Sequence, residues 1–150
     1  QEITTEGGLD LVNFDLEFLK KKLKYLSASS SSQKVLVSIF IDPVIEQIDI
    51  AKKLDVPYIE LNTAAYSEAN NEELRSQCLK ELFESASHAL SIGLRVHAGH
   101  GLTYENIAPI CNMPGLEELN IGHSIVSRSI FVGFEKAVEE MLQLIHFSQV

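Results

Sequence analysis

The chain has 150 residues, of which 45% are apolar and 22% charged, an ordinary balance for one globular core. Twelve basic and 21 acidic residues give a net charge of −9, which argues against nucleic acid as a partner but leaves small anionic substrates open. No apolar run reaches the ~18–20 residues of a membrane span. The two cysteines, Cys78 and Cys111, form no CxxC pair or disulfide framework, which favours a reduced, cytoplasmic compartment.

Short apolar runs alternate with stretches of helical periodicity along the chain. The predicted strands are 35–41, 57–61, 94–98 and 118–121, and the predicted helices are 14–25, 44–54, 71–92, 104–111 and 133–146. Such an alternation indicates βαβ units in a parallel sheet that is covered on both faces. Four units are half of an eight-unit barrel of about 250 residues, although the pattern alone also fits a doubly wound sheet.

Three helix ends carry capping signals. Asn70 or Asn71 is expected to cap the long helix 71–92, and Gly93 stands where its C-terminal cap belongs. Asp42 follows the first predicted strand and is expected to be the N-cap of the next helix, with Pro43 at its first position.

A histidine between two glycines follows the third predicted strand. Ligand-binding and catalytic groups of α/β folds gather at the carboxyl ends of the strands. Gly99 and Gly101 permit a close backbone approach to a ligand, and His100 can exchange a proton near neutral pH. The alternative is a tight turn with an incidental imidazole.

A second glycine–histidine pair follows the fourth predicted strand, before a helical stretch at 125–130. Gly122 lets the backbone approach an anion, and the amides of His123, Ser124 and Ile125 would point from the start of a helix. We therefore expect a phosphate site here, the alternative being a plain turn.

Two polar residues lie inside predicted strands. Glu60 must point into a polar interior or pair with a cation, and a structural role is as plausible as a catalytic one. His97 is interpreted as a hydrogen-bonded interior histidine. No nucleotide fingerprint or metal-ligand spacing occurs, so we expect no metal.

Five segments together resemble the pyridoxine 5′-phosphate synthase family, in order and in spacing: 4–10, 37–42, 58–63, 98–104 and 118–123. The resemblance implies a (β/α)8 TIM barrel. It implies that residues 1–150 are the C-terminal part of one barrel domain, with strands 5–8 and the loop after strand 4. Because the chain opens at Gln1 in a polar segment, we expect further chain upstream.

The resemblance also implies a reaction. The family condenses 1-deoxy-D-xylulose 5-phosphate with 3-amino-2-oxopropyl phosphate to give pyridoxine 5′-phosphate, inorganic phosphate and water, without an organic cofactor, and its full-length members are homo-octamers. By position, His100 matches a catalytic proton donor and Thr4 a contact to the deoxyxylulose phosphate. Gly101, Gly122 and His123 match contacts to the amino-ketone phosphate.

The chain departs from the family pattern at two places. Asn62, Thr63 and Ala64 stand where the family often has His-Thr-Gly, and His97 stands where it often has Asn. The first catalytic histidine and the catalytic glutamate belong to the barrel half that this sequence lacks. Two alternatives therefore stay open: a non-catalytic fragment that binds phosphometabolites, or another phosphate-binding barrel enzyme such as an isomerase or aldolase.

Overall fold

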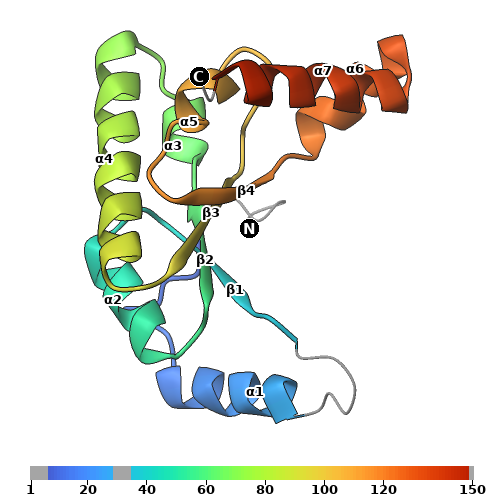
Figure 1. Ribbon diagram of the computed structural model, residues 1–150. Coiled ribbons are helices and arrows are strands. Elements are labelled where there is room, and N and C mark those ends of the chain that lie inside the picture. The colour runs from blue at the N-terminus through green and yellow to red at the C-terminus, as the bar shows by residue number, and fades with distance from the viewer. Residues whose placement is uncertain (1–6, 29–34, 149–150) are drawn as a thin grey trace.

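The computed structural model describes residues 7–28 and 35–148, which form four strands and seven helices. Figure 1 labels these elements. The strands are β1 (Ser38–Ile41), β2 (Tyr58–Asn62), β3 (Arg95–Gly99) and β4 (Leu116–Asn120). The helices are α1 (Leu16–Ala28), α2 (Ile45–Lys53), α3 (Ala64–Ser67), α4 (Glu72–Ser91), α5 (Ile107–Ile110), α6 (His123–Val132) and α7 (Phe134–Ser148). All four predicted strands are confirmed, with ends shifted by up to three residues.

The four strands form one parallel sheet in the order β1-β2-β3-β4. A doubly wound sheet reverses its strand order at a switch point, whereas here each strand lies beside its neighbour in sequence. The sequential order therefore favours the barrel alternative. The α/β class with a parallel sheet is confirmed.

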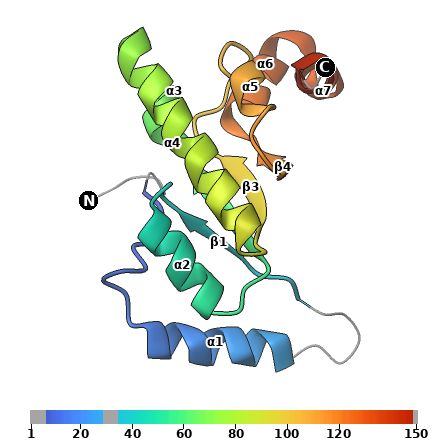
Figure 2. The same cartoon turned by 60° about the vertical axis from the view of Figure 1, so that its left-hand side comes forward.

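Helices cover one face of this sheet in the described part of the chain. Figures 1 and 2 show α2 and α4 on the same side of the strands, with α1 and the α6–α7 pair at opposite ends of the molecule. The covered face consists of buried apolar side chains: Ile39, Ile41, Ile59, Leu61, Val96 and Ala98. The alternate positions form the open face, which is mostly polar and partly exposed: Ser38, Phe40, Tyr58, Glu60, Arg95 and His97. The expectation that both faces are covered is therefore wrong for the described residues.

Two of the three predicted helix ends are confirmed. The Asn71 side chain accepts a hydrogen bond from the Leu74 amide at 2.8 Å and caps α4. Gly93 follows α4 with a φ of +78°, which glycine adopts without strain. The prediction for Asp42 is wrong: α2 begins after Val44, and the Asp42 carboxylate instead accepts hydrogen bonds from the Gly8 amide at 3.2 Å and the Asn62 side chain at 2.9 Å.

None of the helices within residues 7–28 and 35–148 combines the length and the apolar character that a membrane crossing requires.

Candidate functional site

A cleft lies at the carboxyl ends of the strands and opens onto the open face of the sheet. Its wall brings together four residues that the sequence singled out, His100 and Gly101 after β3 and Gly122 and His123 after β4. Other parts of the wall come from three strands, the end of α3, the turns after β3 and β4, and α6: Phe40, Glu60, Glu68, Leu102, Thr103, Asn120, Ile121, Ser124 and Ser127. Thr4, the fifth predicted site residue, lies outside the described residues.

The turn after β3 has an unusual backbone. His100 has a φ of +82°, a conformation that costs a non-glycine residue about 1–3 kcal/mol and persists only where the surroundings hold it. Gly101 follows with a φ of +75°. A Cβ added at Gly101 would lie 2.7 Å from the Ser67 Cβ, so this position requires glycine on steric grounds as well.

Thr63, directly after β2, holds that turn in place. Its amide donates to the Gly99 carbonyl at 2.8 Å. Its hydroxyl lies 2.8 Å from the Gly99 carbonyl oxygen and 2.5 Å from that of His100, so it can donate its one proton to either. Thr63 is fully buried, which strengthens these bonds because water does not compete for the carbonyls.

Two further side chains fix the same turn and join it to the next one. The Asn106 amide group donates to the Gly101 carbonyl at 3.1 Å, and its oxygen accepts from the Thr103 amide at 2.7 Å. The Ser124 hydroxyl, in the first turn of α6, donates to the Leu102 carbonyl at 2.8 Å. The turns after β3 and β4 are thus connected, and the cleft between them is preorganised.

Glu60 reaches the cleft from the open face of β2. A Cβ added at Gly99 would lie 2.4 Å from a Glu60 carboxylate oxygen and 2.9 Å from the Asn120 Cβ, so both side chains cross over this glycine. Burial raises the pKa of Glu60, and a hydrogen bond from Asn120 acts in the opposite direction. A carboxyl group with a raised pKa beside a histidine is suited to proton transfer.

The two histidines of the cleft have different surroundings. The His100 ring stacks on the Phe40 ring, with centroids 6.1 Å apart and planes inclined by 28°, which orients it over the open face. His123 is exposed at the first position of α6, and its predecessor Gly122 is the N-cap. Gly122 makes no side-chain cap, so the first amides of the ten-residue α6 remain available to an anion.

The sequence did not single out Phe40, Thr63 or Asn106, although each shapes the cleft or the turn beside it. Phe40 and Thr63 lie within the segments that resemble the family, at 37–42 and 58–63, and this was the available signal. Within residues 7–28 and 35–148 no group of three or more His, Cys, Asp or Glu side chains is placed to hold a metal ion.

The fold and the cleft define a class of protein: a parallel α/β protein with glycine turns, a histidine and a carboxylate at the carboxyl ends of its strands. The chain belongs to the family described as pyridoxal phosphate biosynthesis protein PdxJ, whose sequence profile matches residues 1–147. It is 44% identical over 149 residues to the pyridoxine 5′-phosphate synthase of Blochmanniella pennsylvanica, covering 99% of this chain and 59% of that protein. The synthase of Gloeothece citriformis is 49% identical over 141 residues, covering 94% of this chain and 57% of that protein. The chain thus spans less than two thirds of the length of these relatives.

Proposed function

We propose that the protein carrying this chain is a pyridoxine 5′-phosphate synthase. It would condense 1-deoxy-D-xylulose 5-phosphate with 3-amino-2-oxopropyl phosphate and release inorganic phosphate and water. The observation that carries this proposal is the cleft that joins Glu60 and His100 to two glycine turns, in a chain whose relatives are named for this activity.

The proposal includes a (β/α)8 barrel in which residues 1–150 are the C-terminal part of a single domain. The parallel order β1-β2-β3-β4 and the helices on one face support it, because a barrel keeps its helices outside and turns the other face inward. The four strands would then be strands 5–8 of the barrel. The family resemblance further supports a homo-octamer and a cytoplasmic location for the whole protein.

The cleft offers two kinds of chemistry. Glu60 in its carboxylate form accepts a proton from the substrate, and His100 donates one, as ring closure with loss of water requires. The Gly101 backbone and the amides at the start of α6 bind the amino-ketone phosphate, with Gly122 allowing close approach and His123 beside it. Thr4 is proposed as the contact to the other phosphorylated substrate.

The decisive experiment replaces His100 by alanine in the whole protein. Turnover should fall by about 100-fold or more, the usual contribution of a positioned acid, while binding of inorganic phosphate measured by calorimetry persists. His146→Ala, on the exposed end of α7, is the control and should behave as the parent. Unchanged turnover in His100→Ala would remove this residue from the catalytic role. Phosphate binding by a whole protein without any turnover would favour the non-catalytic alternative.

A further inference from the structure

Three ionisable side chains lie in a row across the open face of the sheet. Glu60 on β2 is the register partner of His97 on β3, and His97 is the partner of Glu118 on β4. Register partners in neighbouring parallel strands project to the same face. The His97 imidazole therefore stands between two carboxylates, and the Glu60 end of the row is part of the cleft.

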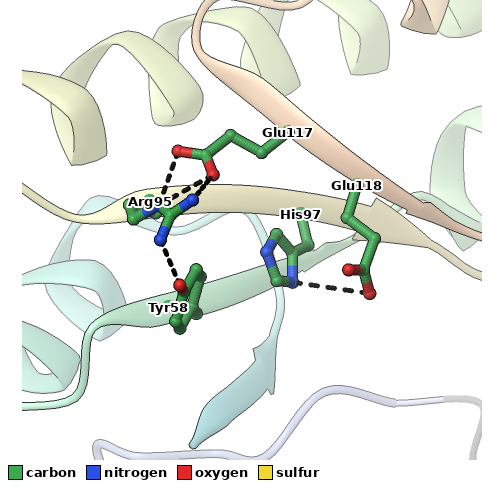
Figure 3. Close-up of polar contacts among 5 residues, drawn as sticks. All are labelled: Tyr58, Arg95, His97, Glu117 and Glu118. Atoms are coloured by element: carbon green, nitrogen blue, oxygen red, sulfur yellow. Dashed lines mark hydrogen bonds and ion pairs between the residues drawn. The ribbon is translucent and has the colours of Figure 1, made fainter. Parts of the chain in front are cut away.

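A register shift in β4 brings a second glutamate to the same region. Val96 pairs with Leu116 but His97 pairs with Glu118, so Glu117 is the extra residue of a bulge. Figure 3 shows the result: Glu117 meets Arg95, and Glu118 meets His97. The bulge thus supplies one carboxylate to each of the two basic side chains on β3.

Arg95 is already balanced by its own partners. Its Nε donates to both carboxylate oxygens of Glu117 at 2.7 Å, and a second guanidinium nitrogen bonds the same carboxylate. The guanidinium also lies over the Tyr58 ring, 4.5 Å from its centroid, and donates to the Tyr58 hydroxyl (Figure 3). Because Glu117 matches the charge of Arg95, it is His97 that faces the other two carboxylates.

His97 is held firmly in this position. Its side chain is only 12% exposed, its Nδ1 lies 3.9 Å from a Glu118 carboxylate oxygen, and its ring centroid is 4.9 Å from that of Tyr58. The neighbouring strand β1 contributes Phe40 and Ser38 to this face, neither of them charged. The other titratable or charged groups that face the row are Tyr58, Arg95, His100 and Glu117.

We propose that His97 is a positioning residue that, in its imidazolium form, keeps the Glu60 carboxylate ionised and ready to accept a proton. The inference rests on the proposed function, which places Glu60 in the reaction. It assigns His97 no contact with substrate, because its partners are Glu118, Tyr58 and the neighbouring Glu60.

The electrostatic balance around Glu60 gives the direction of each effect. Burial raises the pKa of Glu60, the Asn120 hydrogen bond and attraction to His97 lower it, and repulsion by Glu118 raises it. Loss of the His97 charge should therefore raise the pKa of Glu60. Loss of the Glu118 charge should lower it.

The test is the pH dependence of kcat/KM of the whole protein, whose acid limb includes the ionisation of Glu60 beside that of the catalytic glutamate of the other barrel half. His97→Asn should move this limb to higher pH and keep the plateau above it within about twofold, since only the fraction of ionised Glu60 changes. Glu118→Gln should move the limb to lower pH. The control is His88→Asn, which breaks a similar imidazole–carboxylate pair, 2.7 Å to Asp49, between α4 and α2, and should leave the limb in place.

A second readout does not depend on turnover: the titration of the Glu60 carboxyl carbon followed by NMR in the free protein. The titration midpoint of Glu60 should move to higher pH in His97→Asn and to lower pH in Glu118→Gln. If His97→Asn does not fold, His97→Gln takes its place. A uniform loss of kcat/KM with an unmoved limb and an unmoved Glu60 titration would overturn the proposal and leave His97 a packing residue. A protein that forms no product at any pH contradicts the proposed function, whereas the NMR titration still decides the role of His97.

Discussion

The two faces of the sheet are built from alternate residues of the same strands, yet they have opposite character. Ile59 and Val96 point to α2 and α4 and are fully buried. Glu60 and His97, each one residue later, point to the open face and bear charge or polarity. The interior of a typical barrel is filled with branched apolar side chains, whereas the open face of this sheet is mostly polar. Burial on one face stabilises the fold, and this leaves the other face free to carry ionisable groups that contribute little to stability.

The largest expected effect is on the free energy of unfolding, which a substitution on the covered face should lower far more than one on the open face. Ile59→Ala should lower the free energy of unfolding by about 2–5 kcal/mol, because it leaves a cavity on the covered face. Ser38→Ala on the open face should change it by less than about 0.5 kcal/mol, since Ser38 is exposed. Urea unfolding followed by circular dichroism measures both values. Equal losses would show that the two faces contribute alike.

An intermediate effect is expected where the open face meets the cleft. Gly99→Ala should cost about 1–3 kcal/mol, because its Cβ would lie 2.9 Å from the backbone oxygen of Asn120 and would also displace the Glu60 side chain. Gly7→Ala is the matched control, as a Cβ there meets nothing within 4 Å. The same unfolding experiment reports both changes, and a neutral Gly99→Ala would mean that the strands separate easily at this point.

The smallest expected effect is the pH-dependent destabilisation that the partly buried Glu60 carboxylate imposes on the folded chain. Burial raises the pKa of Glu60 in the folded chain, so the folded state holds this proton more tightly than the unfolded state. The contribution of Glu60 to stability is therefore lost as the pH rises from its unfolded to its folded pKa. Glu60→Gln should be more stable than the parent at neutral pH, and this gain should vanish in acid. Exposed Glu105→Gln, measured over the same pH series, should show no such trend.

The sequence predicted the elements of this fold better than the contacts between them. The runs at 57–61 and 94–98 matched β2 and β3 to within a residue, and the glycines marked the turns of the cleft. The alternation of short apolar strands with helices suggested cover on both faces, whereas one face carries exposed Ser38 and partly exposed Glu60 and His97. Of the predicted strand 35–41, only 38–41 form a strand. The single-turn helix α3 was missed because four residues are too few to show helical periodicity.

Hydrogen bonds between residues far apart in the sequence could not be predicted, because they depend on how the strands are aligned in the sheet. Thr63 bonds the carbonyl of a residue 37 positions later, which no local pattern indicates. Asp42 was predicted to cap a helix because it follows a strand and precedes a proline. In the structure its carboxylate instead accepts a hydrogen bond from Asn62 on the neighbouring strand β2. The roles assigned to His100, Gly101, Gly122 and His123 stay predictions, although the structure brings these residues to one cleft.

The sequential order of the strands also bears on how the chain folds. Within residues 7–28 and 35–148, each strand pairs with strands adjacent to it in sequence, and the helix between two strands packs nearby. Contacts of short sequence separation have a low entropic cost of loop closure and form early. The sheet can therefore grow strand by strand along the chain, and the turns that bear His100 and His123 are formed only after β1 and β2 are available to pair with β3.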